Sequence, residues 1–511
     1  MAYIQPDGII QFFGDIGLSP NYENTLYFGT AAAKDLYFDG LTPLTTASAL
    51  TYSRQQRGFV RVEKSIATML NAGYMRFKNT AFSSKWFYAF VKSVEYINHS
   101  TTQVNFELDV MMTWMGNFQL GECFVERQHG TTDIAGDNVV EENLDLGDYV
   151  YNSVERTGLM DSYTIIIGAS VDQNGDPVAG GTMINDIYSG IVLHQFGTVA
   201  AANSFIDDLT GKAASSAIVG CVMCPSIFYQ EHAYAGQVVH IAKNNATING
   251  YTPVNKKLFT YPYNYLVVTN GLGNYATMRY EFFSTSDCQF NLTGVANLQP
   301  EAVLMPLYYK NVPSTFADVP AKMEISCFPQ CAFNIDQYKA FLAQNSSTIA
   351  VEAVSTATSG VINTVTNAMN LNVGGAVRSA YTAAEKAARL MAFHSDYARK
   401  PTQSNGVTTG GWLASNRKLD FYFLKQSITA QYARMIDGYF TMYGYAQNKM
   451  MTPNMNARPH WTFVKTAGCV LSGNLPADDA AKIENIFDNG IRFWKDHTKI
   501  GHYSSYSNAP T

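Results

Sequence analysis

One run of strict alternation constrains the fold more than any other feature of the chain. Between residues 103 and 114, the apolar residues Val104, Phe106, Leu108, Val110, Met112 and Trp114 alternate with a set that is polar except for Met111. A period of two predicts a strand with one dry face and one wet face. Residues 86–97 are its expected hairpin partner, joined through the polar turn 98–102. Both strands exceed the usual length of about five or six residues, and long strands suit a large barrel or tube.

Composition extends this expectation to the whole chain. Charged residues make up 15% of the 511 residues, against about 25% in an average soluble protein, and aromatic residues make up 13%. Few charges and many aromatic side chains favour pleated, half-buried surfaces. We therefore predict a mainly β protein with α insertions. The net charge of −6 argues against a surface that grips nucleic acid through its phosphates.

Local composition and residue patterns divide the chain into five parts. A helix is expected at 198–212 inside an insertion, and a strand followed by an amphipathic helix at 421–443. Another helix is expected to start at Pro476. The predicted parts are a β-barrel part (1–131), an inserted domain (132–253), a second β-barrel part (254–333), a helical or long-loop segment (334–410) and a C-terminal part (411–511).

The segment 334–410 contains the most unusual stretch of the sequence. Residues 353–377 contain no charged side chain, and ten of these 25 residues are Ser, Thr or Asn. A core or interface helix rich in small residues is one interpretation. The other is a long mobile segment that meets lipid as several chains together, because one such chain could not satisfy its polar groups in hydrocarbon. The candidate membrane-active residues are Ile349, Val351, Val361, Ile362, Val365, Met369, Leu371, Val373 and Val377.

Signatures of catalysis, metal binding and cofactor binding are weak or missing, so none is predicted. Cys221 and Cys224 have zinc-ligand spacing, and 327–331 could be a second half, but 218–223 is an apolar run in which Cys acts as a small hydrophobe. Glu107 and Asp109 could flank a small glycosidase site, although such pairs normally come from separate elements. The stretch 172–176 is predicted to be a hairpin turn rather than a calcium loop. His129 is predicted to lie in a salt-bridged turn.

Several motifs, taken in their order along the chain, are similar to those of the tail knob, or distal tail tube, proteins of small short-tailed phages of the Bacillus type. Together they cover roughly residues 1–130 and 410–505. The motifs are Lys85-Trp-Phe-Tyr-Ala-Phe90, Phe106-Glu-Leu-Asp-Val-Met-Met-Thr-Trp114, Glu126-Arg-Gln-His129, Tyr443-Gly-Tyr445, Pro453-Asn454, Arg458-Pro-His-Trp461, Gly473-Asn474 and Ile486-Phe-Asp-Asn-Gly-Ile-Arg-Phe-Trp494.

The resemblance implies a structural virion protein, not an enzyme. It implies tail-tube-like β-barrel domains that assemble into a hexameric ring or tube at the tip of a short tail, next to upstream tail or collar proteins. It also implies a knob insertion and a plug, which residues 345–400 would provide, that leaves the tube to breach the host membrane. Such a protein is made in the host cytoplasm, conducts double-stranded DNA without binding it specifically, and uses no cofactor.

The wet face of the long strand fits the wall of such a tube. Gln103, Asn105, Glu107 and Asp109 are the predicted lumen-facing residues. An acidic or neutral lining lets DNA slide, whereas a basic lining would bind it phosphate by phosphate. Two alternatives stay open: another tail adaptor or receptor-binding virion protein, whose insertion touches the host surface, and an enzyme that cleaves cell-wall glycan through Glu107 and Asp109.

Overall fold

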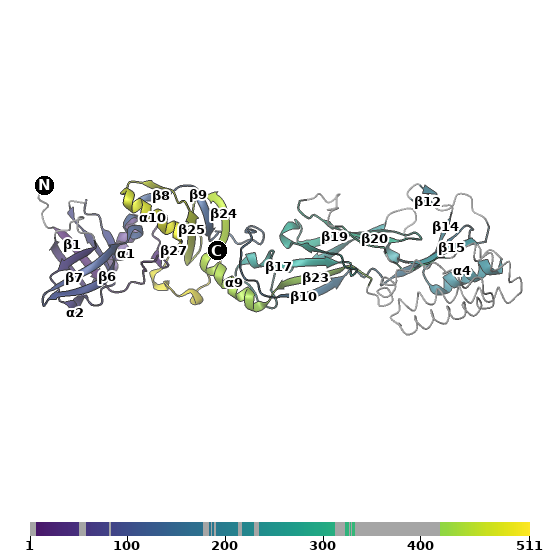
Figure 1. The fold of residues 1–511 in the computed structure, drawn as a ribbon, viewed down its shortest axis with the longest axis horizontal. Helices are drawn as coiled ribbons and strands as arrows, with labels where there is room; N and C mark the ends of the chain where they lie inside the picture. Colours follow the sequence, from purple (N-terminus) through teal and green to yellow (C-terminus); the bar gives the residue numbers. More distant parts are fainter. Residues whose placement is uncertain are drawn as a thin grey trace, which may run out of the picture. The chain divides into compact units, whose positions relative to one another are not determined.

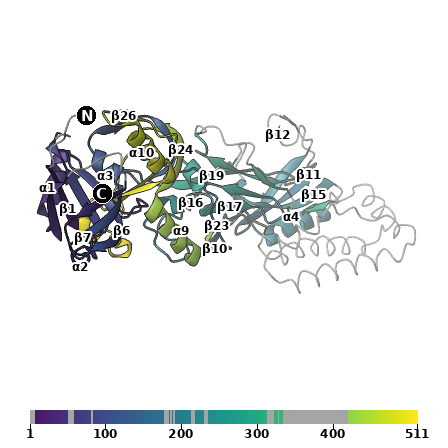
Figure 2. The same cartoon turned by 60° about the vertical axis from the view of Figure 1, so that its left-hand side comes forward.

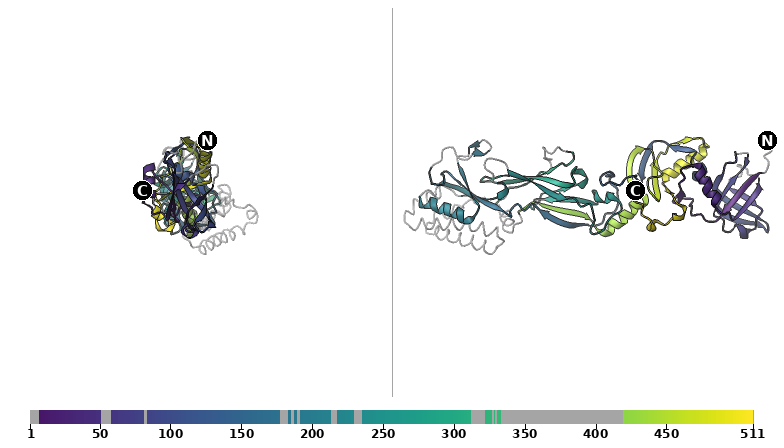
Figure 3. Two further views of the ribbon diagram at one scale, coloured as in Figure 1. Left: turned by 90° about the vertical axis from the view of Figure 1, so that its left-hand side faces the viewer. Right: turned by 180° about the vertical axis from the view of Figure 1, so that it is seen from behind.

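The computed structural model divides the chain into two compact units. Unit 1 comprises residues 1–147, 250–260 and 429–511, and unit 2 comprises 148–249 and 261–428. The structure describes residues 7–50, 58–80, 83–176, 183–184, 187–188, 191–212, 217–228, 235–311, 322–326, 328, 330–332 and 419–510. The predicted plug segment, with all nine candidate membrane-active residues, therefore lies outside the described residues. Figures 1–3 show the fold from several sides.

Unit 1 begins with a six-stranded antiparallel sheet, called sheet I. One hydrophobic cluster joins Ala47 and Val62 on its two edge strands to Phe77 and Phe106 near its middle, so the sheet curves into a half-barrel. The short helix α2 (Ile66–Met69) adds Met69 to this cluster. In spatial order the strands are β3 (Thr45–Leu50), β1 (Gly8–Phe13), β5 (Tyr74–Lys78), β6 (Phe87–Asn98), β7 (Thr101–Leu108) and β4 (Phe59–Val62).

A second, five-stranded sheet completes unit 1 from distant parts of the sequence. Trp461 and Trp494, with ring centroids 5.0 Å apart, pack into the same cluster as Phe13 and Tyr74 of sheet I. Sheet II consists of β2 (Thr25–Leu26), β27 (Ile491–Trp494), β25 (Trp461–Ala467), β9 (Cys123–Gln128) and β24 (Tyr445–Met451). The remaining elements are α1 (Ala31–Gly40), α3 (Val110–Trp114), α9 (Ala430–Tyr443), α10 (Ala477–Asn489), and the pair β8 (Phe118–Leu120) and β26 (Leu471–Gly473).

Unit 2 contains a sandwich of two four-stranded sheets, which Figure 1 shows as two layers. Phe290 and Phe423 meet between the layers with ring centroids 4.9 Å apart. Sheet III consists of β10 (Tyr149–Arg156), β23 (Tyr422–Ile428), β17 (Asn264–Thr269) and β18 (Tyr275–Met278). Sheet IV consists of β16 (Ala235–Ala242), β19 (Asp287–Val295), β20 (Glu301–Leu307) and β21 (Met323–Ile325).

A third sheet of unit 2 carries a helix on one face. The helix α4 (Val199–Gly211) buries Phe205, Ile206 and Leu209 against Ile165 and Ile167. Thr198 caps its start by accepting a hydrogen bond from the amide of Ala201. Sheet V consists of β14 (Val192–Phe196), β11 (Tyr163–Ala169), β15 (Ile218–Pro225) and β22 (Gln330–Ala332), and a small pair is formed by β12 (Met183–Ile184) and β13 (Ile187–Tyr188).

The mainly β prediction is confirmed, and so are the predicted helix at 198–212 and the strand followed by a helix at 421–443. Pro476 is the N-cap of α10, as predicted. The partition into units differs from the five predicted parts. Residues 133–147 belong to unit 1, and residues 250–260 return to unit 1 between two segments of unit 2.

The prediction of one continuous strand from 103 to 114 is wrong. β7 pairs with β6 as a hairpin, as expected, but it ends at Leu108. Asp109 then caps α3 by accepting a hydrogen bond from the amide of Met112 at 2.9 Å. Val110, Met111, Met112 and Thr113 are all buried, because the helical turn is packed on every side. Residue types can alternate in a segment that is buried on all sides, so the alternation did not reveal that the strand ends at Leu108.

Candidate functional site

The exposed face of the β6–β7 hairpin is the best candidate for a functional surface in unit 1. Val104 and Phe106 point into the half-barrel, so Gln103, Asn105 and Glu107 point away from it. Their cross-strand neighbours also belong to this outward face. Asn105 lies opposite Ser93, and Gln103 lies opposite Glu95 on β6 and Arg61 on β4. We call this surface, made of Arg61, Lys92, Ser93, Glu95, Gln103, Asn105 and Glu107, the carboxamide face.

Hydrogen bonds connect five residues of the carboxamide face, and the other two form an ion pair. The guanidinium of Arg61 donates to the side-chain oxygen of Gln103 at 3.1 Å. The Gln103 amide nitrogen donates to Glu95 at 3.2 Å, and the Asn105 amide nitrogen donates to Ser93 at 2.8 Å. Lys92 pairs with Glu107. Each charged side chain therefore has a partner within the face, which leaves a polar surface of low net charge.

Asp109 does not share this face, so its assignment to the wet side is wrong. It is 1% exposed and accepts a hydrogen bond from the hydroxyl of Tyr74 at 2.9 Å. Burial raises the pKa of Asp109 to about 6, while bonds from Met112 and Tyr74 and the charge of Lys34 act in the opposite direction. Because Glu107 is exposed and Asp109 is buried, the two carboxylates do not form a shared glycosidase site.

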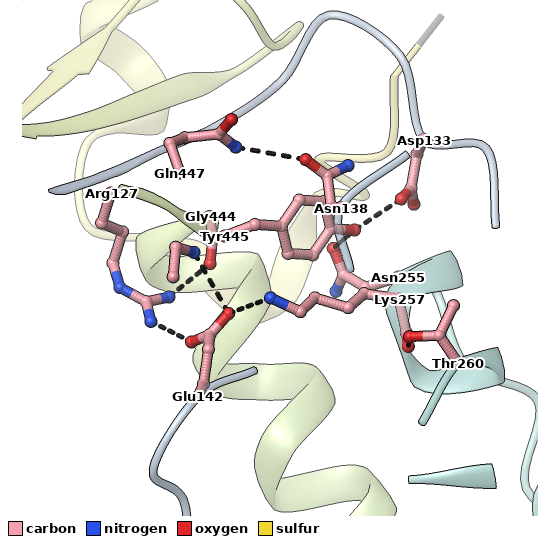
Figure 4. Close-up of polar contacts among 11 residues, drawn as sticks. Arg127, Asp133, Asn138, Glu142, Asn255, Lys257, Thr260, Gly444, Tyr445 and Gln447 are labelled. Atoms are coloured by element: carbon pink, nitrogen blue, oxygen red, sulfur yellow. Dashed lines mark hydrogen bonds and ion pairs between the residues drawn. The ribbon is translucent and has the colours of Figure 1, made fainter. Parts of the chain in front are cut away.

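A second polar constellation, shown in Figure 4, lies in the interior of unit 1. Glu142 is paired with both Arg127 and Lys257, and its side chain is 3% exposed. It also accepts a hydrogen bond from the amide of Ala446 at 3.1 Å. Burial lowers the pKa of Lys257, and the neighbouring Glu142 carboxylate acts in the opposite direction. Sequence analysis placed Glu142 in the inserted part 132–253 and did not identify this buried carboxylate.

The same interior network fixes the segment 250–260. Tyr445 donates to Asp133 at 2.6 Å, and the Asp133 carboxylate accepts the amide of Lys256 at 2.9 Å. Asp437 of α9 accepts the hydroxyl of Tyr251 at 2.6 Å and the amide of Asn255 at 2.9 Å. All these acceptors are engaged within the protein. The network holds the chain where it leaves and re-enters unit 1.

His129 is buried and neutral, so the prediction of a salt-bridged turn is wrong. Its Nδ1 accepts the amide of Phe463 at 2.8 Å, which leaves Nε2 to donate to the carbonyl of Thr441 at 3.1 Å. Burial first, and then the charge of Arg458, lowers the pKa of His129 to about 3. The histidine thus joins β9, α9 and β25 through hydrogen bonds.

Steric crowding around position 444 explains the glycine of the Tyr443-Gly-Tyr445 motif. Gly444 has a φ of 67°, and a Cβ there would come within 2.4 Å of the Gln128 backbone. Arg127 donates to the Gly444 carbonyl at 2.6 Å. Only glycine allows α9 to end against β9 in this way.

Cys221 and Cys224 do not meet as a pair of metal ligands, although strand register places the backbone of Cys331 opposite Cys221. Cys221 belongs to the cluster beneath α4 and Cys224 to the sandwich core, on opposite faces of β15. The carboxylate of Asp172 accepts the amides of Asn174 and Asp176 within its own turn. Within the described ranges no three His, Cys, Asp or Glu side chains gather as a metal site would require. Of the helices that the structure describes, none has the length and apolar character needed to span a membrane.

Comparison with known proteins places the chain among phage tail proteins. It is 25% identical to the tail knob protein gp9 of Bacillus phage PZA and to that of Bacillus phage phi29, each over 99% of both chains. The solved structure of the bacteriophage C1 tail knob protein, gp12, has the same fold, with a TM-score of 0.66 and 14% identity over 97% of this chain and 98% of that one. The family model of the caudoviral major tail protein N-terminus matches residues 7–119, which contain sheet I.

The model of the Bacillus phage phi29 tail knob protein gp9 C-terminal domain matches residues 230–508, more than half of the chain. This match includes α9, most of sheets II and III, and all of sheet IV. The predicted resemblance is therefore confirmed, and the chain belongs to the tail knob protein family of short-tailed phages.

Proposed function

We propose that this tail knob protein forms a ring of six copies at the tail tip, and that the carboxamide face lines the channel through which DNA leaves the particle. The observation that carries the proposal is the chemistry of this face. Lys92 and Glu107 pair with each other, the charged groups of Arg61 and Glu95 are hydrogen-bonded to the carboxamide of Gln103, and the remaining groups are a carboxamide and a serine hydroxyl. Such a lining holds no row of cations that could grip phosphates, so DNA passes without sticking. The protein acts as a structural part, bound to the tail proteins above it, and not as an enzyme.

Electron microscopy of the purified protein tests the ring directly. Negative-stain images are expected to show hollow rings. Their opening should be wider than duplex DNA, whose diameter is roughly 20 Å. Solid particles or monomers would contradict the proposal. Tilted views would also give the number of copies.

Charge reversal on the face tests the role of the lining. The pair Glu107→Lys and Asn105→Lys should slow genome ejection, and the delay should be larger at low salt because ions screen the attraction between lysine and phosphate. Glu122→Lys, at an exposed site that follows β8, is the matched control and should leave ejection unchanged. A delay that does not depend on salt would indicate that the variant acts through structure rather than through charge.

We also propose that residues 345–400 act on the host membrane during ejection. This part of the proposal rests on the uncharged sequence 353–377 and lies outside the described residues. Deleting 353–377 should leave ring assembly intact and abolish leakage from anionic liposomes. Loss of rings would instead assign the segment to the structural core, and normal leakage would exclude the membrane role.

A further inference from the structure

Two cysteines of sheet V lie opposite each other on neighbouring strands. Strand register pairs Cys331 of β22 directly with Cys221 of β15, and one further pair on each side continues the ladder. Directly opposite residues of an antiparallel pair have Cα atoms about 4.5 Å or about 5.5 Å apart, depending on their hydrogen-bonding position. Both values lie within the range of about 4.4–6.8 Å that a disulfide can span between Cα atoms. The backbone therefore brings this pair within disulfide reach.

The pair also lies on one face of sheet V, because directly opposite residues of a pleated sheet share a face. Cys221 is 7% exposed and belongs to the hydrophobic cluster that α4 covers, together with Ile165 and Ile167 of β11. A bond between the two strands at this position would lie on the helix-covered side of the sheet. Buried disulfides of this kind are slow to meet a reductant.

Two other cysteines described in unit 2 lack such a pairing. Cys224 lies opposite Thr164 on β11, and Cys288 lies opposite Ile241 on β16. Burial raises the pKa of each of these two thiols to about 12, so neither readily forms the thiolate that attacks a disulfide. They provide matched controls for Cys221.

Reagents can reach the pair through β22. This strand has three residues and lies at the edge of sheet V, next to β15. Short edge segments open at a fraction of the free energy that unfolds a whole domain. Each opening would expose the thiols to solution, whereas Cys224 would stay within the sandwich core. Closure of the strand would then bury the new bond.

We propose that Cys221 and Cys331 form a disulfide once the particle has left the cell. Disulfides persist on virions and are rare in the cytosol, where thiols are kept reduced. The oxidant is a low-molecular-weight disulfide. One cysteine thiolate attacks it and releases one small thiol, and the second cysteine then attacks the mixed disulfide and releases the other. The two cysteines together lose two electrons and two protons, and the small disulfide is reduced to two thiols.

The bond would fasten the anchor of the segment that follows it in the chain. β22 ends at Ala332, and the proposed membrane-active residues 345–400 come after it. A force on that segment would peel away a three-residue strand that is held by backbone hydrogen bonds alone. A covalent link to β15 keeps the strand in place. This consequence rests on the proposed membrane role, but the bond itself depends on neither that role nor the ring.

Oxidation of the folded, full-length protein tests the bond. The protein is purified in dithiothreitol and transferred to either fresh dithiothreitol or oxidised glutathione. Iodoacetamide then blocks the remaining thiols, the protein is digested without reduction, and mass spectrometry maps the peptides that are joined by a disulfide. Cys331→Ala removes one partner, and Cys224→Ala is the matched control on the same strand as Cys221. Phage particles isolated without reductant are mapped in the same way.

The expected result is a linked peptide pair containing Cys221 and Cys331 in oxidised wild type and in Cys224→Ala, at least about tenfold above its level in dithiothreitol. Oxidation should also raise the thermal midpoint of the wild type by at least about 3 °C, because the bond closes a long loop, and this shift should be absent in Cys331→Ala. The wild-type map decides the question even if a variant does not fold.

Alkylation of both cysteines in the oxidised, folded protein and in released particles would overturn the inference. A linked pair that joins Cys221 to a different cysteine would overturn it as well. Neither outcome affects the proposed ring, because negative-stain images of the reduced and oxidised samples report ring formation separately.

Discussion

The carboxamide face of unit 1 and the outward face of sheet III in unit 2 are built on the same plan and end in opposite chemistry. Each is the outward side of an antiparallel sheet whose inward side packs in a hydrophobic core: Phe106 faces inward in sheet I, and Phe423 faces inward in sheet III. Outward, one sheet carries amides and paired charges, and the other carries the exposed side chains of Tyr151, Val154 and Tyr275. Packing of the inward side stabilises the fold, and the chemistry of the outward side determines which molecules can bind there. We interpret the carboxamide face as a surface that stays open to water.

The largest effect should come from the two inward sides, which the comparison treats as equivalent. Phe106→Ala and Phe423→Ala each leave a cavity in a packed core, so each should lower the free energy of unfolding by about 3–5 kcal/mol. Chemical denaturation followed by tyrosine and tryptophan fluorescence measures this loss. Asn105→Ala is the control for the first variant. A loss below about 1 kcal/mol for either phenylalanine would mean that its sheet is not held by that core.

The end of β7 offers a sharper test, because Glu107 and Asp109 lie two residues apart but in different environments. The folded-state pKa of Asp109 is raised to about 6 from an ordinary value near 3.8. Between about pH 4 and pH 6 the unfolded chain is ionised at this position while the folded protein retains the proton. Ionisation therefore costs folding free energy, and stability falls as the pH rises through this window.

Asp109→Asn should remove that pH dependence. A shift of about two pKa units corresponds to roughly 3 kcal/mol, so the stability of the wild type relative to Asp109→Asn should fall by up to that amount from pH 4 to pH 7. Asn caps a helix about as well as Asp, so α3 should persist. Denaturation at both pH values measures the difference. Two parallel pH profiles would show that Asp109 is not desolvated as the fold indicates.

Sequence reasoning predicted one of the two outward faces and missed the other for an identifiable reason. The alternation around Phe106 is local, and the β6–β7 hairpin is formed by neighbours in the chain, so pattern alone placed Gln103 and Asn105 outward. Sheet III pairs β10 with β23, which lies more than 250 residues away. No local pattern reports that partner, so the outward position of Tyr151 was not predictable.

The same limit applies to the buried charges and to the β7 terminus. Glu142 could not be recognised as a buried ion-pair partner, because Arg127 and Lys257 come from separate segments that only the tertiary fold brings together. Asp109 looked like a wet-face residue until the short helix it caps was known. Secondary structure and the family motifs were predictable, whereas the burial of individual polar groups was not. The Asp before an apolar run at 110–112 was the available signal for a cap.

The smallest effect concerns the stability contributed by the two outward sides themselves. Glu107→Gln breaks an exposed pair with Lys92, and Val154→Thr replaces one exposed β-branched side chain with another. Exposed pairs and exposed apolar side chains contribute little to the folding of a single chain. Each variant should therefore change the free energy of unfolding by no more than about 0.5 kcal/mol. Salt should separate the two small effects: ions screen the attraction between Lys92 and Glu107, so the effect of Glu107→Gln should shrink at high salt, whereas that of Val154→Thr should not. Chemical denaturation at low and high salt measures both. A loss above about 1 kcal/mol for either variant would mean that its outward side stabilises the fold as a packed inward side does, and the division between inward stability and outward chemistry would not hold for that sheet.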